Sequence, residues 1–97
     1  DITYEIHGEI EVKSNQRFEI IRAVRELIFN AMRHADCSVI QIRLTSNQIE
    51  IEDNGVGGVI EKQNSYGLLG VRERLAEIGA LIEIKSGSTG STILISL

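Results

Sequence analysis

The chain has 97 residues, enough for one domain with a modest core, and 42% of them are hydrophobic and 25% charged. These fractions are ordinary for a soluble globular protein and exclude a disordered or fibrous chain. The net charge of −4 argues against a nucleic-acid partner, because such proteins usually present a basic face, but it leaves a nucleotide ligand open. The single Cys37 excludes an internal disulfide and fits a reducing compartment.

The chain starts at Asp1 and not at Met, so we expect it to be an excised piece of a longer protein. It contains no apolar run near the ~20 residues of a membrane span, and nothing in it resembles a signal peptide. We therefore expect a cytoplasmic domain, and a membrane anchor elsewhere in the parent protein stays open.

The first predicted elements are strands and a long helix. Residues 3–12 alternate apolar and polar around Gly8, which predicts two short strands or one bent strand. A helix capped by Ser14 or Asn15 then runs to about Ala35. Its apolar positions follow the spacing of an amphipathic helix and are Phe18, Ile21, Val24, Leu27, Ile28 and Ala31.

A hairpin and a glycine-rich segment follow. Residues 39–44 and 48–52 alternate apolar and polar around a Thr-Ser-Asn turn, which predicts two antiparallel strands. The glycine-rich segment at 53–58 closes the second strand, and residues 59–66 lack periodicity and are interpreted as a loop.

The last predicted elements are a helix and a closing hairpin. The apolar spacing from Leu68 to Ile78 predicts a helix that Gly79 ends. Strands are expected at 81–85 and 92–97 around a Gly-Ser-Thr-Gly-Ser turn. The whole order predicts an α/β two-layer sandwich, in which helices pack on one face of a mixed β-sheet.

A first candidate site lies on the long helix, where Glu26 and Asn30 are four residues apart. Four residues exceed one helical turn by only about 40°, so both side chains project from one face. Carboxylate and amide oxygens are the ligands that Mg²⁺ prefers. Arg33 and His34 follow one turn later and could meet phosphate charge. Spacing alone fits a plain solvated polar stripe more often than a metal site.

Two glycine-rich segments are candidate nucleotide contacts. Asp53 opens the segment 53–58, where a fixed carboxylate could accept a hydrogen bond from the amino group of a base, although Asp-Asn-Gly is also a common turn. The segment Gly-Leu-Leu-Gly at 67–70 opens the second helix, whose N-terminal amides suit a phosphate. Two glycines that merely loosen a helix start explain the second segment equally well.

Taken in their order along the chain, these motifs resemble those of a known superfamily. RELIFNAMRHA, EDNGVGG, YGLLGVRER and GSTGST, in that order over about residues 16–97, resemble the N, G1, G2 and G3 boxes of the GHKL ATPase superfamily. That superfamily includes gyrase, heat-shock chaperone ATPases, mismatch-repair proteins and histidine kinases. RELIFNAMRHA and YGLLGVRERL are most similar to the nitrate-sensor type of histidine kinase, which has a short ATP lid. The resemblance implies the Bergerat fold, an α/β sandwich.

On the long helix, the resemblance implies a metal and phosphate site. Asn30 would hold Mg²⁺, and Glu26 would sit beside the metal or polarise the reacting group as the catalytic residue. Arg33 matches the basic position that faces the phosphates. His34 matches the wording of the family in this helix and is not expected to be the phosphoacceptor.

In the glycine boxes, the resemblance implies an ATP pocket. Asp53 would bind the adenine amino group, and Ser91 stands where the family usually has a threonine that helps to fix adenine through a water. Gly87 lies one place earlier than the usual glycine of the last box. The residues implied to shape the base pocket are Gly55 and Gly57. Those implied to embrace the phosphates are Gly67, Leu68 and Gly70.

The function implied by the resemblance is that of the catalytic ATP-binding domain of a two-component sensor histidine kinase, spanning residues 1–97. Such a domain binds ATP and Mg²⁺ and passes the γ-phosphoryl group to a histidine on a separate dimerisation and phosphoacceptor domain, and thence to a response regulator. That dimerisation domain is absent here, so the chain should bind ATP and barely turn it over. The parent is expected to be a homodimer and this piece a monomer.

Three alternatives are weighed against this interpretation. The first is another GHKL enzyme such as an anti-sigma-factor serine kinase, which the G2 wording and the short lid disfavour. The second is a catalytically degenerate nucleotide-binding module, which the presence of Glu26, Asn30 and Asp53 disfavours. The third is a structural α/β domain in which the boxes are coincidental turns.

Overall fold

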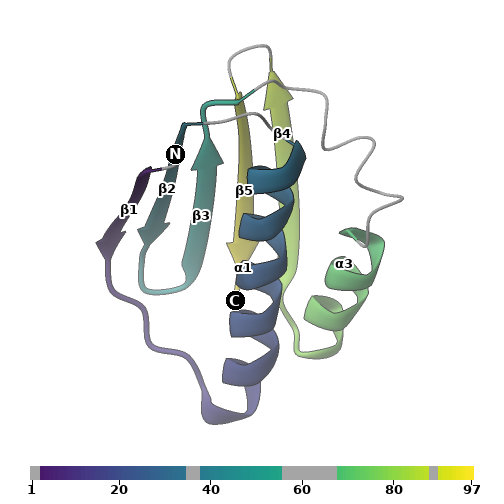
Figure 1. The fold of residues 1–97 in the computed structure, drawn as a ribbon. Coiled ribbons are helices and arrows are strands. Elements are labelled where there is room, and N and C mark those ends of the chain that lie inside the picture. The colour runs from purple at the N-terminus through teal and green to yellow at the C-terminus, as the bar shows by residue number, and fades with distance from the viewer. Residues whose placement is uncertain (1–2, 35–37, 56–67, 88–89) are drawn as a thin grey trace.

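The computed structural model describes residues 3–34, 38–55, 68–87 and 90–97, which form five strands and two helices (Figure 1). Their bounds in chain order are β1 Thr3–Gly8, α1 Ser14–His34, β2 Val39–Leu44, β3 Gln48–Asp53, α3 Leu68–Glu77, β4 Leu81–Gly87 and β5 Gly90–Ser96. Neither of the two described helices is both long enough and apolar enough to cross a membrane.

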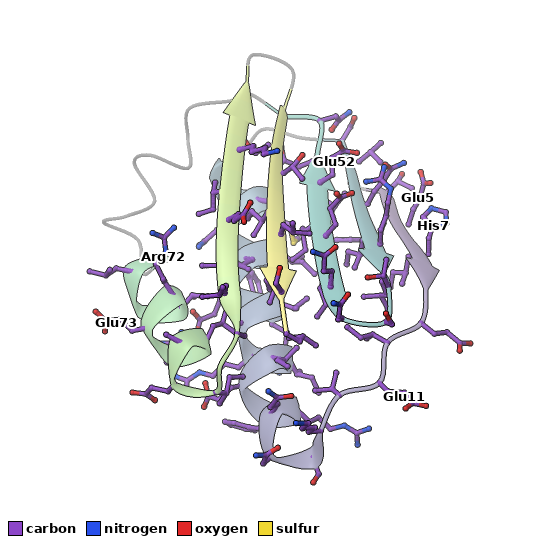
Figure 2. All side chains as sticks on the ribbon, turned by 180° about the vertical axis from the view of Figure 1, so that it is seen from behind. Glu5, His7, Glu11, Glu52, Arg72 and Glu73 are labelled. Carbon is purple, nitrogen blue, oxygen red and sulfur yellow. The ribbon has the colours of Figure 1, made fainter. Side chains whose placement is uncertain are left out.

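The strands form one mixed sheet in the order β1-β2-β3-β5-β4. β1 runs parallel to β2, and the other three pairs are antiparallel. Both helices lie on the same face of this sheet (Figure 1). Seen from behind, the opposite face carries the side chains of Glu5 and Glu52 and no described helix (Figure 2). The predicted two-layer α/β sandwich is therefore confirmed.

The helix-covered face of the sheet is built from rows of side chains that pair across the strands. One row consists entirely of isoleucines, namely Ile6, Ile42, Ile51, Ile93 and Ile84. The row beside it is also aliphatic and consists of Leu44, Ile49, Ile95 and Ile82. Towards the C-terminal end of β3 the next row changes character, because Ile40, Asp53 and Ser91 pair there. The apolar core thus ends at a row that carries a carboxyl and a hydroxyl group.

Helix α1 packs on these rows through one stripe of buried residues, spaced three or four apart: Ile20, Ala23, Leu27 and Ala31. The prediction that Phe18 and Ile21 belong to the core face was wrong, since they are 72% and 52% exposed. Phe18 precedes Leu27 by about two and a half turns, which turns it to the opposite side of the helix. The apolar residues of this helix therefore form two stripes, of which the described structure covers one.

The N-terminal strand is shorter than predicted. β1 ends at Gly8, so the expectation of strand structure up to residue 12 was wrong. Gly8 has a φ of 91°, and a Cβ atom there would lie 2.1 Å from the carbonyl oxygen of Leu44. Gly8 pairs with Leu44, the last residue of β2, so the pairing ends there and the chain then leaves the sheet towards α1.

The C-terminal elements follow the prediction with longer strands. α3 ends at Glu77, and Gly79 behind it has a φ of 80°, as expected for a helix stop. Its residues Val71 and Leu75 are fully buried. The last two strands continue to the paired residues Gly87 and Gly90, beyond the predicted limits. The predicted loop at 59–66 lies outside the described residues.

Candidate functional site

The polar end of the covered face carries two of the predicted site residues. Asp53 is the last residue of β3 and pairs with Ser91 of β5. It follows Ile49 and Ile51 at alternate positions, so its side chain lies on the same face as the core. Asp53 is 8% exposed and Ser91 is 3% exposed. The sequence predicted a binding residue at the end of this strand. The structure places a buried carboxyl group beside a buried serine there.

The environment of Asp53 raises the pKa of its carboxyl group above the ordinary value. Burial is the main cause, because it disfavours the charged form, and the negative charge of Glu52 adds to it. Hydrogen bonds from the backbone N–H groups of Gly55 and Ser91 act in the opposite direction and lower the pKa. The Gly55 nitrogen lies 3.0 Å from Oδ1 of Asp53. The result is a fixed, poorly solvated acceptor, which suits a neutral N–H donor of a ligand.

Gly90 makes the approach of β5 to Asp53 possible. A Cβ atom at Gly90 would lie 2.1 Å from the carbonyl oxygen of Asp53, and the φ of Gly90 is 146°. Sequence analysis singled out Gly87 in this segment and missed Gly90. The signal was present in the second glycine of Gly-Ser-Thr-Gly-Ser-Thr, but the pattern alone does not tell which glycine adjoins Asp53.

Asn54 ties the ends of two strands together behind Asp53. Its Oδ1 accepts hydrogen bonds from the backbone nitrogens of Ser38 and Val39, both at 2.9 Å. Its Nδ2 donates to the hydroxyl of Ser38, also at 2.9 Å. The sequence pattern predicted Asn54 only as part of a turn, whereas in the structure its side chain adds to the β2–β3 ladder by joining the C-terminal end of β3 to the start of β2.

The second group of predicted residues lies on α1. Glu26 and Asn30 are both half-buried and stand one turn apart on the same helix. Oε2 of Glu26 accepts a hydrogen bond of 2.7 Å from Nη2 of Arg74 on α3. Oε1 of Glu26 lies 3.6 Å from Nε of Arg22. Both carboxylate oxygens therefore face guanidinium groups, a contact that sequence analysis did not foresee.

These donors fit a Mg²⁺ ion that takes most of its ligands from phosphates and water. Mg²⁺ in nucleotide sites typically needs only one or two protein oxygens. Among the described residues, no group of three or more His, Cys, Asp or Glu side chains could hold a metal by itself. Asn30 offers an amide oxygen, whereas Glu26 would have to leave Arg74 to bind a metal directly. The arrangement fits Asn30 as a ligand and Glu26 as a neighbour of the metal.

The structure thus brings the predicted residues together in two groups, Asp53 with Gly55 and Ser91 on the sheet, and Glu26 with Asn30 on α1. The other predicted site residues are placed only in part. Gly70 lies in the first turn of α3. Arg33 and Leu68 lie in helices, but their side chains are outside the described part, and Gly57 and Gly67 lie outside it altogether.

Comparison with known proteins identifies the family of this domain. Residues 15–97 match the family described as histidine kinase-, DNA gyrase B-, and HSP90-like ATPase. The sensor protein VraS of Staphylococcus epidermidis is 35% identical over 91 residues, covering 88% of this chain and 26% of VraS. The nitrate/nitrite sensor protein NarQ of Escherichia coli is 27% identical, covering 88% of this chain and 16% of NarQ. The chain therefore spans about a quarter or less of the length of these relatives.

A solved structure agrees with the sequence relatives. The histidine kinase domain from the blue-light activated histidine kinase of Erythrobacter litoralis superposes with a TM-score of 0.78 at 25% identity, covering 99% of this chain and 51% of that chain. The chain belongs to the histidine kinase-, DNA gyrase B-, and HSP90-like ATPase family. Within that family it is a histidine kinase-type ATPase domain of the kind found in sensor kinases, as the resemblance implied.

The close approach at Gly90 leads to a stability prediction. Gly79→Ala should cost about 1–2 kcal/mol, because alanine is strained at positive φ but its Cβ would meet nothing within 4 Å. Gly90→Ala should cost more, because its Cβ would also collide with the backbone of Asp53. Urea unfolding of both variants measures the difference. Equal losses would show that β5 does not need to approach Asp53 so closely.

The raised pKa of Asp53 leads to a pH prediction. The pKa of this group is higher in the folded than in the unfolded chain, so the folded chain binds its proton more readily. The stability of the unchanged chain relative to an Asp53→Asn variant should therefore increase as the pH falls from about 7 to about 4. Urea unfolding at several pH values measures this difference, in which the other carboxyl groups cancel. A relative stability that falls with decreasing pH would contradict the assigned direction.

Proposed function

We propose that this domain binds ATP together with Mg²⁺ between the polar end of the sheet and the C-terminal half of α1. The observation that carries the proposal is the buried Asp53 carboxyl group, held by backbone N–H groups beside Ser91. Burying a carboxyl group at a sheet end costs stability, which a ligand-free scaffold has no need to accept. Membership in the ATPase family supports ATP as the ligand that makes use of it.

The base and the phosphates are assigned to different residues. Asp53 accepts a hydrogen bond from the adenine amino group, and the hydroxyl of Ser91 helps to fix the base through a water. Gly55 and Gly57 shape the base pocket. The residues assigned to the phosphates and the lid are Arg33, Gly67, Leu68 and Gly70.

Asn30 is assigned to hold Mg²⁺, whose charge offsets that of the phosphates. Glu26 is assigned to polarise the reacting group next to the metal. A kinase of this type achieves its rate mainly by positioning and electrostatic stabilisation, so the domain supplies a fixed nucleotide and leaves the nucleophile to its partner.

We further propose that the phosphoryl group passes to a histidine on a dimerisation domain of the parent protein, and from there to a response regulator. The names sensor protein and sensor histidine kinase among the relatives support this two-component role. In this proposal the parent is a homodimer, anchored in the cell membrane with this domain on the cytoplasmic side.

The first test is calorimetric titration of the chain with a non-hydrolysable ATP analogue, comparing it with Asp53→Ala. Loss of the carboxylate should abolish measurable binding, because the base pocket then lacks its acceptor, while circular dichroism should show an intact fold. Glu52→Ala is the matched control, since Glu52 precedes Asp53 but points to the open face (Figure 2). Unchanged affinity in Asp53→Ala would contradict the assigned base pocket. Absence of binding by the unchanged chain at millimolar analogue would contradict the proposed function.

The second test concerns the metal. Mg²⁺ should strengthen binding of the analogue to the unchanged chain, and Asn30→Ala should remove most of that enhancement while leaving metal-free binding nearly the same. The same titration with Mg²⁺ and with EDTA measures both quantities. An equal enhancement in the two proteins would mean that Asn30 is not a metal ligand.

A further inference from the structure

The contact between α3 and α1 centres on Arg74, a residue that has no part in the proposed function. Nη2 of Arg74 donates a 2.7 Å hydrogen bond to Oε2 of Glu26, and its Nε lies 3.8 Å from Oε2 of Glu19. Glu19 and Glu26 are about two helical turns apart, so the guanidinium group lies across one face of α1. The Arg74 side chain is 29% exposed, which makes the ion pairs partly shielded from solvent.

Two features of the surroundings favour this position of Arg74. A Cβ atom at Gly70 would lie 3.2 Å from Nη1 of Arg74, closer than usual contacts, so the glycine leaves room for the guanidinium group. Oε2 of Glu19 is buried and accepts no hydrogen bond among the described residues, so its charge attracts the same group. On the other side of Glu26, Arg22 lies 3.6 Å from Oε1.

We propose that Arg74 is the positioning residue for Glu26 and thereby couples α3 to the metal end of the nucleotide site. This inference rests on the proposed function of Glu26 beside Mg²⁺. A single charge-assisted hydrogen bond to one oxygen fixes the rotamer of Glu26 and leaves Arg22 to face the other oxygen. Arg74 acts on the metal only through Glu26, as outer partners of metal-site residues do.

Placement on α3 gives this contact a second consequence. α3 begins at Leu68, and Gly70 and Arg74 are one turn apart on it. The hydrogen bond from Arg74 to Glu26 therefore connects the second turn of α3 to α1.

The test compares Arg74→Gln with Arg25→Gln in the full 97-residue chain. Both variants lose one positive charge, but Arg25 is exposed and forms no ion pair or hydrogen bond with the described residues. The measured quantity is the Mg²⁺ enhancement, which is the dissociation constant of the non-hydrolysable ATP analogue in EDTA divided by that in Mg²⁺. Loss of the outer partner of a metal ligand typically weakens a metal site by about 10–100-fold, and the lower end applies here because Glu26 is a neighbour of the metal and not its ligand. Arg74→Gln should therefore lower the enhancement by up to about 10-fold, with metal-free affinity nearly unchanged, and Arg25→Gln should retain it.

A double-mutant cycle separates positioning from plain stability. If Arg74 acts through Glu26, the double variant Arg74→Gln/Glu26→Gln should lose no more of the enhancement than Glu26→Gln alone. A purely structural Arg74 would instead lower the unfolding midpoint and weaken metal-free binding, with additive effects in the cycle. An enhancement in Arg74→Gln that is equal to or greater than that of the unchanged chain would also overturn the inference.

The outcomes also distinguish this inference from the proposed function. If the unchanged chain binds the analogue in a Mg²⁺-dependent way but the losses in the cycle are additive, only the role of Arg74 is rejected and the proposed function stands. Absence of nucleotide binding or of any Mg²⁺ enhancement in the unchanged chain would reject the proposed function, and the positioning role would fall with it.

Discussion

The burial of one carboxyl group at the end of β3 is the constraint on which the site depends. Two aliphatic rows cover the sheet beneath the helices, and Asp53 stands where the next row would otherwise be apolar. A buried carboxyl group is tolerated only if its oxygens find donors. The donors come from the backbone of Gly55 and Ser91, so the turn after β3 and the start of β5 must both reach Asp53. Gly90 and Asn54 serve that same requirement, one by omitting a side chain and the other by tying β3 to β2.

The apolar core orients the second half of the site without contributing to its chemistry. Leu27 and Ala31 each follow a site residue by one position, and both are buried against the sheet. Their burial fixes the rotation of α1, which leaves Glu26 and Asn30 at the flank of the buried stripe. The side chain of Glu26 points towards α3, where Arg74 donates a hydrogen bond to it. Packing of aliphatic side chains therefore decides which direction the polar ones can face.

Periodicity in the sequence predicted the elements well, because alternation and helical spacing are local properties of the chain. Periodicity failed where two apolar stripes on one helix have the same spacing. On α1, one stripe runs around Leu27 and a second one includes Phe18. Spacing alone cannot say which stripe meets the sheet. Asp53 could be chosen from its motif, but its burial and the role of Gly90 depend on the pairing of two strands more than thirty residues apart. The role of Asn54 likewise depends on Ser38 and Val39, 16 and 15 residues earlier in the chain.

Some glycines of the predicted motifs have a role within the protein itself. Two of them, Gly90 and Gly70, are explained by neighbouring protein atoms, since one admits the backbone of Asp53 and the other admits the guanidinium group of Arg74. A glycine that is needed to make room for other protein atoms does not by itself indicate a bound phosphate. The case for a nucleotide rests more firmly on Asp53, because its carboxyl group is costly to bury even with the backbone N–H groups of Gly55 and Ser91 as donors. The same glycines remain compatible with a ligand, since a backbone without side chains also leaves room for one.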